Sequence, residues 1–515
     1  MCLALTAMLL TGSFMQPAEA TTVEDSLVIG IQSSKTHLLR PLEPVERDIL
    51  SVYDLMYDGL ITINDDYLPE GNLAETFTTS NGKTWTFKLR RGVKFSNNEE
   101  MTAHDVVATA NWLLAKANNA DSTDKGFYVN LKYFIDSISA EDDYTVIVKA
   151  ERAYYGVLYA MTFPIIPASE LQNDNPPGTG AYICDYFAPG VGLRLVPNPH
   201  WWQGQPQVTS IIFEMNDTAE EVINDFEYNR VDAIFTRSIA SAQYKGGSSS
   251  LALDYRTNQL ECLLMNHSAF PLNRQSVREA IRCMVNVDKI ANDIYNGMVD
   301  RTDTPFIAGT WMYNDNLSSY FRTDPQRGLD LLAADGWADV DDDGILERLN
   351  DSGNYVELKM SLYVYEEPDN DVRLEMANYI ADTLNQYGFN VTVETKRFTD
   401  VQQALSVGNF HLCLAAYAMD PCPDAGFLLM KSNTGNYCRY RSDAMTDLCT
   451  RLRSQVKMTD YQHVLHLIQE QFAQDCPFIC LFYRSGTVLT RRMYTTVRDV
   501  REYELLKGID TFRND

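Results

Sequence analysis

The chain has 515 residues, 45% of them hydrophobic and 11% aromatic, which is ample for packed cores but too long for a single one. Two or three lobes are therefore expected. The 70 acidic residues outnumber the 43 basic ones and give a formal net charge of −27. Such a charge repels phosphate backbones and anionic lipid surfaces, so the composition argues against nucleic acid as a partner.

Residues 1–20 have the pattern of an export signal. A short apolar run from Leu3 to Leu10 is followed by Ala18-Glu19-Ala20, which has the small-x-small form of a signal-peptidase site. The pattern departs from the usual one because no basic residue precedes Lys35. No later segment has the roughly 18 uncharged apolar residues that a membrane-spanning helix needs. We therefore expect an exported protein, in the periplasm or at the outer face of the cytoplasmic membrane.

The first half of the chain alternates predicted strands with predicted helices. A helix over 46–57 places Ile49, Val52, Tyr53 and Met56 on one face. The turn-rich run NDNPPGTG, residues 173–180, predicts a lobe boundary. Further predicted strands are 27–31, 60–63, 85–89, 144–148, 193–196, 210–215 and 231–235. One further predicted helix opens with a capping box at Thr102, and another is capped by Thr218 and ends at Tyr228. Two more predicted helices cover 274–295 and 325–334.

The section from 356 to 417 is the most regular. Strands at 356–364, 389–395 and 412–417 alternate with helices at 372–386 and 400–407. This β-α-β-α-β order predicts parallel strands joined by right-handed crossovers, so all three strands end at the same rim. That rim would collect aromatic and ionic groups, as a polar ligand site requires: Tyr365, Glu366, Glu367, Lys396, Arg397, Tyr417 and Asp420. Helices at 444–456 and 460–472 and a strand at 478–482 are expected next.

Asp420 stands where the strand before it stops. Residues 411–418 form a nearly uncharged run typical of a strand buried on both faces, and Pro421 and Pro423 cannot continue it. Ligands of open α/β sheets bind in the crevice beyond the carboxyl ends of the strands, so Asp420 is a candidate ligand contact. The alternative is an Asp that only opens a turn or caps the next helix, which is the more common role of Asp before Pro.

Ten cysteines are present, and six of them fall between Cys413 and Cys480, a density typical of an oxidising compartment. A disulfide between Cys422 and Cys438 is preferred, with Cys476–Cys480 as the next choice. Zinc is disfavoured because no C-x-x-C pair occurs.

Asp339 to Ile345 has the spacing of a calcium loop, with carboxylates at positions one, three and five followed by glycine. The twelfth position holds Asn350 instead of the expected Glu, which favours a solvated turn and no metal. No G-x-S-x-G elbow, H-E-x-x-H or Walker loop is found. The sequence therefore favours binding over catalysis, with a secreted hydrolase as the alternative from another class.

Several segments together resemble the extracellular solute-binding proteins of the dipeptide and oligopeptide ABC transporters, family 5. They run in order from about residue 27 to about residue 488, which is more specific than any one of them. Among them are VYDLMYDGL (52–60), GKTWTFKLRRGVKFSNNEEMTAHDVVATA (82–110), GTGAY (178–182), VPNPHWWQGQP (196–206) and LLAADGWADVDDDGILE (331–347).

This resemblance implies a periplasmic-binding-protein-like α/β fold, in which two lobes close on a ligand about a hinge and a further lobe is inserted. The expected boundaries are 21–52, 177–268 and 483–515 for lobe I, 53–176 for the inserted lobe II, and 269–482 for lobe III. A monomer without cofactor is expected, which passes a small peptide or peptide-like solute to a membrane permease and its ATPase. Nickel, a sugar or an opine are alternative solutes, because members of the family differ.

The resemblance also implies roles for single residues. Peptide-binding relatives hold the ligand's α-ammonium group with an acid in a stretch like 417–428, and Asp420 stands at that position with Tyr417 at the preceding aromatic one. Pro423-Asp424 reverses the usual Asp-Pro. Dipeptide-specific relatives place an arginine where this chain has Glu366-Glu367-Pro368. Either Arg397 substitutes for it, or the ligand is longer, or it is not a peptide. The predicted ligand-binding residues are Asp420, Tyr417, Arg397, Tyr365 and Glu367.

Overall fold

The computed structural model describes residues 26–43, 46–119, 127–245, 250–367, 371–491 and 500–509. The predicted export signal, residues 1–20, lies outside the described residues. Among the helices that are described, none is both long and apolar enough to span a bilayer.

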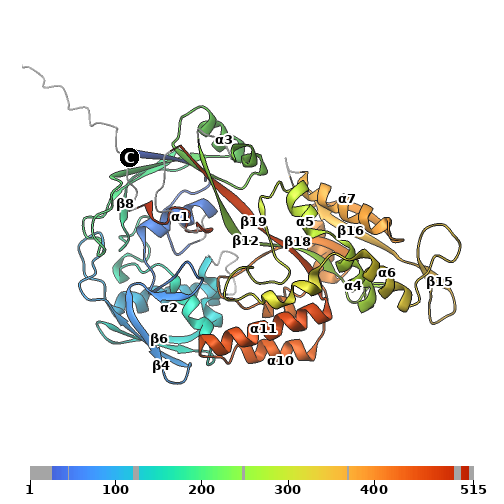
Figure 1. Ribbon diagram of the computed structural model, residues 1–515. Helices are drawn as coiled ribbons and strands as arrows, with labels where there is room; N and C mark the ends of the chain where they lie inside the picture. The colour runs from blue at the N-terminus through green and yellow to red at the C-terminus, as the bar shows by residue number, and fades with distance from the viewer. Residues whose placement is uncertain are drawn as a thin grey trace, which may run out of the picture.

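One large mixed sheet runs through the molecule in the order β17-β16-β18-β12-β19-β11-β1-β10-β9-β8, and β13 pairs with β19. The long antiparallel strands β12 and β19 connect its two ends and cross the middle of Figure 1. The strands are β1 (Ser26–Gln32), β8 (Tyr182–Ala188), β9 (Gly192–Pro197), β10 (Ser210–Asn216), β11 (Ala233–Thr236), β12 (Leu251–Met265), β13 (Val299–Arg301), β16 (Lys359–Tyr365), β17 (Asn390–Lys396), β18 (Leu412–Ala418) and β19 (Phe478–Thr490).

One end of this sheet is built as the periodicity predicts. β1 pairs in parallel with β10 and with β11, and α3 (Ala219–Glu227) begins at Thr218, whose hydroxyl accepts a hydrogen bond from the Glu221 amide. α1 (Arg47–Met56) buries the predicted face of Ile49, Val52, Tyr53 and Met56. Its opposite face carries the exposed Asp54.

A separate antiparallel sheet has the order β4-β5-β7-β6. Its strands are β4 (Ala74–Thr79), β5 (Thr84–Leu89), β6 (Ile135–Asp142) and β7 (Thr145–Ala150), and α2 (Ala103–Asn118) packs on β6 and β7. The predicted capping box opens α2, with the Asp105 carboxylate accepting from the Thr102 amide at 2.9 Å. β2 (Ile61–Ile63) pairs with β3 (Pro69–Gly71) beside this sheet, and short helices follow at η2 (Phe127–Tyr133), η3 (Tyr155–Thr162) and η4 (Ala168–Glu170).

The predicted β-α-β-α-β unit is confirmed. β16, α7 (Val372–Asn385), β17, α8 (Phe398–Val407) and β18 follow one another, and β16 pairs in parallel with both β17 and β18. The three strands therefore end at one edge of the sheet. β18 also pairs antiparallel with β12, with Gln259 opposite Ala418. β12 thus connects this unit, through β19, to the other end of the sheet. The lobe boundaries remain a prediction.

Three predicted elements differ from the structure. The helix predicted over 274–295 is broken into α4 (Gln275–Met284), α5 (Val287–Lys289) and η6 (Ile290–Ile294), because Val285 and Asn286 are extended and the Asn286 side chain caps the next turn. The strand predicted over 356–364 is divided between β15 (Tyr355–Glu357), which pairs with β14 (Glu347–Leu349), and β16. β19 continues to Thr490 because it pairs with β12 and β11.

Helices α10 (Asp443–Leu452) and α11 (Met458–Asp475) lie near the four-stranded sheet in Figure 1. The Tyr155 amide donates to the Gln455 carbonyl at 2.7 Å, and the hydroxyls of Tyr154 and Tyr461 lie 3.2 Å apart. Contacts therefore join residues predicted for lobe II to residues predicted for lobe III. The remaining helices are η5 (Ile239–Tyr244), η7 (Asp315–Phe321), α6 (Pro325–Ala334) and α9 (Gly426–Leu429).

The predicted disulfides are wrong, because all nine cysteines in the described part of the chain are free thiols. The Cys422 thiol lies 3.4 Å from the Tyr154 hydroxyl, whereas Cys438 is buried near Met265 of β12. Cys476 donates to the Arg278 carbonyl, and Cys480 faces Cys262 across the β12–β19 pair. Proximity in sequence did not bring the expected partners together.

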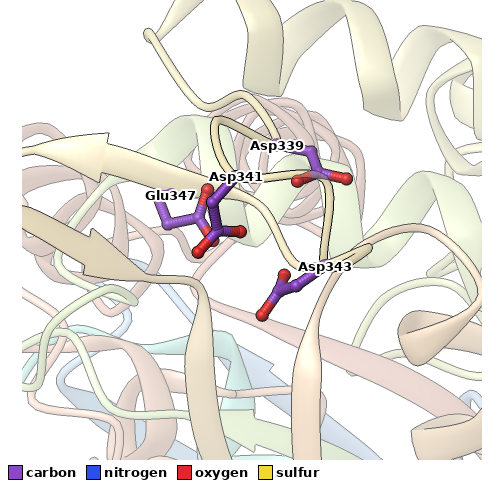
Figure 2. A group of neighbouring side chains, drawn as sticks. All are labelled: Asp339, Asp341, Asp343 and Glu347. Atoms are coloured by element: carbon purple, nitrogen blue, oxygen red, sulfur yellow. The ribbon is translucent and has the colours of Figure 1, made fainter.

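The Asp-rich turn brings Asp339, Asp341 and Asp343 together with Glu347, and their carboxylate oxygens lie within 4.8 Å of one another (Figure 2). Glu347, at position nine of the motif, supplies an acid that was not predicted from the sequence, whereas position twelve holds Asn350. Its Oε2 accepts a hydrogen bond from the Val340 amide at 2.9 Å. Groups of exposed carboxylates are common in proteins even where no cation is bound, so we assign no metal to this turn.

Candidate functional site

A cavity of about 520 Å³ lies beside α1, β12 and the segment that follows β18. This volume is within the range of about 300–1,000 Å³ that is typical of small-ligand sites. Its lining also includes Tyr67, Trp201 and Phe306, and residues 501–504 and 506–508 near the end of the described chain. Aromatic walls with several carboxylates among them suit an organic ligand that carries positive charge.

Asp420 lines this cavity. Its Oδ1 accepts a hydrogen bond from the Cys422 amide at 2.9 Å, which is the turn-forming role weighed in the sequence. Its Oδ2 accepts from Asn130 Nδ2 at 3.2 Å. Asp420 thus opens a turn and at the same time lines the cavity.

No cation pairs with the Asp420 carboxylate among the described residues. The side chain is open to the cavity but surrounded by protein, and this burial raises its pKa, while its two hydrogen bonds offset only part of the effect. A carboxylate in such surroundings is stabilised by a ligand that brings a positive charge.

The other four predicted residues lie outside the cavity lining. Tyr417 is buried in the core, where its hydroxyl donates to the Gly435 carbonyl at 2.9 Å and its ring stacks on Tyr437. Arg397 precedes α8 on the surface, and its guanidinium pairs with Asp400 at 2.8 Å. Sharing a sheet edge therefore did not bring these side chains to one site.

Glu367 instead belongs to a largely buried charge network, named here the Glu261 network, whose other members are Glu261, Arg373 and Arg484. Tyr365 packs against this network through Arg373. Arg373 donates to Glu261 at 2.5 Å and to Glu367 at 2.9 Å, and Arg484 donates to the same two carboxylates at 2.6 and 2.9 Å. Arg373 lies 4.2 Å from the centre of the Tyr365 ring. Burial opposes the charged form of Glu367, but the two arginines together hold its pKa below the usual value.

Two acids of the segment after β1 also line the cavity and were not predicted from the sequence: Asp54 and Asp58. Asp58 is fully engaged, because it accepts hydrogen bonds from Asn72, Thr179 and Trp202 at 3.1, 2.8 and 3.2 Å. Asp54 has no hydrogen bond and no ion pair within the part of the chain that the structure describes. The available signal for Asp54 was the first of two acids in the run VYDLMYDGL, and in the sequence it cannot be distinguished from an ordinary exposed helix position.

The basic residues of the lining are already paired. Arg256 donates to Asp300 at 2.8 Å, Arg501 to Glu504 at 2.6 Å, and Lys507 to Asp65 at 2.6 Å. None of the basic groups described in the lining therefore remains for the carboxylate of a ligand without breaking an ion pair. The charge that the cavity offers is negative.

A model of the family described as bacterial extracellular solute-binding proteins, family 5 Middle, matches residues 69–437, which is more than half of the chain. The chain belongs to family 5. Its α/β architecture is that of this family's periplasmic-binding-protein fold. HbpA2 from Haemophilus parasuis superposes with a TM-score of 0.80 at 20% identity, over 94% of this chain and 99% of that protein.

The relatives of this family 5 protein differ in the ligands that their names state. The oligopeptide-binding protein AppA of Bacillus subtilis is 20% identical over 89% of this chain and 86% of its own length. The nickel-binding protein NikA of Staphylococcus aureus is 21% identical over 84% of both chains. Family membership therefore shows a solute-binding protein and leaves the solute to be argued from the cavity.

Proposed function

We propose that this protein is the exported solute-binding component of an ABC importer, and that its solute is a peptide or peptide-like molecule with a free amino group. The observation that carries the proposal is Asp420, a cavity carboxylate without a cationic partner among the described residues. Family membership supports the transport role, and the name of the AppA relative is compatible with a peptide.

The energetics favour an ammonium group at Asp420. Each hydrogen bond from an ammonium group to the charged carboxylate contributes about 1.5–3 kcal/mol, and less where solvent reaches the pair, as it does while Asp420 is open to the cavity. Asp420 therefore selects a free amino terminus, while the rest of the peptide contacts the wall.

Nickel bound directly by protein side chains is disfavoured, because no histidine is found in the described lining of the cavity. The same observation weighs against a hydrolase that uses a histidine base there. We expect the protein to act as a monomer that delivers its solute intact to a permease with its ATPase.

Native mass spectrometry of the purified protein tests this proposal, because it weighs the molecule that copurifies. A mass that matches a short peptide is expected, and a metal or sugar mass would overturn the peptide assignment. Calorimetry with that molecule on the Asp420→Ala variant should show an affinity at least about tenfold weaker, equivalent to about 1.4 kcal/mol. An unchanged affinity would remove the role of Asp420.

A further inference from the structure

The cavity contains more carboxylates than its paired bases can compensate. Six acids line it: Asp54, Asp58, Asp420, Asp424, Glu502 and Glu504. Asp424 pairs with Arg453 at 2.6 Å, Glu502 with Arg47 at 3.2 Å, and Glu504 with Arg501 at 2.6 Å. Asp58 accepts three hydrogen bonds from neutral donors. Asp54 and Asp420 remain as the two acids of the described lining that have no ion pair.

The two unpaired carboxylates lie on different walls of the cavity. Asp54 projects from α1, on the face opposite the one that α1 buries, whereas Asp420 follows β18 at the other end of the large sheet. Because they come from different elements, the two carboxylates provide two separate positions on the cavity wall for a cation.

The surroundings of Asp54 are acidic overall. The Asp54 side chain is open to the cavity, but the protein that surrounds the cavity raises its pKa above the usual value, and the nearby charges of Glu504 and Asp58 raise it further. Lys507 and Arg501 act in the opposite direction with smaller effect, and both are already paired, with Asp65 and Glu504. A cation from the ligand would relieve this repulsion.

We propose that the cavity binds two separate cationic groups of one ligand, the amino terminus at Asp420 and a basic side chain at Asp54, and therefore prefers peptides that contain lysine or arginine. This inference rests on the proposed peptide-binding function and adds a second site to it. The overall charge of −27 assists it, since it attracts cationic ligands to the protein.

Matched peptide sets test this second site. One set consists of tetra-alanine peptides with lysine at the second, third or fourth position, and the other replaces that lysine with norleucine, which keeps the alkyl chain and lacks the charge. For the wild type, calorimetry should find at least one lysine peptide that binds about tenfold or more tightly than its norleucine counterpart. Equal affinity within every pair would overturn the inference but leave the peptide-binding function standing.

Two variants separate the sites. Asp54→Asn should abolish the preference for lysine while it retains the affinity for the norleucine peptides. Asp420→Asn should weaken both sets by a similar factor and keep the ratio between them. Survival of the lysine preference in Asp54→Asn would overturn the role of Asp54, and failure of the wild type to bind either set would overturn the proposed function together with this inference.

A proton count supplies a readout that a folding defect would not mimic. Because a bound cation favours the charged carboxylate, the lysine peptide should release protons on binding to the wild type. Its binding enthalpy should then differ between phosphate and Tris buffers, and the difference should shrink in Asp54→Asn. A buffer dependence that is identical in both proteins would contradict proton release at Asp54.

Discussion

The cavity carboxylates and the Glu261 network show what a partner does to a buried acid. In the Glu261 network, Glu261 and Arg373 are almost inaccessible to solvent, and two arginines bind two glutamates. In the cavity, Asp54 and Asp420 have no cation among the described residues. A satisfied network stabilises the fold, whereas unpaired carboxylates beside a cavity are available to a ligand. The partners of an acid, more than its place on a sheet edge, indicate its role.

The largest expected effect follows from breaking the Glu261 network. Arg373→Met leaves Glu261 buried without its closest cation, at a cost of about 3–5 kcal/mol of unfolding free energy. Chemical denaturation measures this loss. The double variant Arg373→Met with Glu261→Leu should lose less than the single one, because it removes both charges. If Arg373→Met were as stable as the wild type, the network would not have the structural role given to it here.

Asp420→Asn should change ligand binding and leave stability intact. The amide keeps the shape and the hydrogen bond to Cys422 but lacks the charge, so affinity for a peptide with a free amino group should fall by about tenfold or more. Asp443→Asn is the matched control, because that exposed carboxylate pairs with Lys431 on the surface. Equal weakening in both variants would point to the overall charge of the protein and not to the cavity.

The pH dependence of stability should have opposite signs in the two regions. The pKa of Asp54 is raised in the folded state, so the stability it contributes is complete below its unfolded value near 3.8 and is lost as the pH rises through the folded pKa. The pKa of Glu367 is lowered, so its contribution is complete above about 4.5 and is lost as the pH falls.

Thermal unfolding of Asp54→Asn without ligand checks the cavity side of this contrast. The variant should be more stable than the wild type at pH 7, and the difference should diminish toward pH 4, where the wild-type carboxyl becomes neutral as well. A variant that is less stable than the wild type at pH 7 would show that Asp54 has a stabilising partner.

The smallest effect is expected at Arg397. Its pair with Asp400 is exposed and screened by solvent, so Arg397→Ala should alter neither the denaturation midpoint nor peptide affinity to a measurable degree. Loss of peptide affinity in this variant would restore Arg397 as a ligand contact and contradict its placement outside the cavity.

Local patterns were sufficient to predict the β-α-β-α-β unit and the end of β18, and so led to Asp420. They could not show which rim residues meet. Glu367 is bound by Arg484, which lies 117 residues further along the chain, and Tyr417 lies in the core among other aromatic rings. Asp54 was missed for the same reason, since its significance depends on Glu504 from the far end of the chain. Contacts between distant segments decide these roles.

The most direct test of the cavity as a cation site compares one peptide in two forms. Calorimetry should be carried out with the copurified peptide and with the same peptide acetylated at its amino terminus. If Asp420 holds the amino terminus, acetylation should weaken binding to the wild type by about tenfold or more and have little further effect on Asp420→Asn. Equal binding of both forms to the wild type would contradict the claim that Asp420 holds an ammonium group.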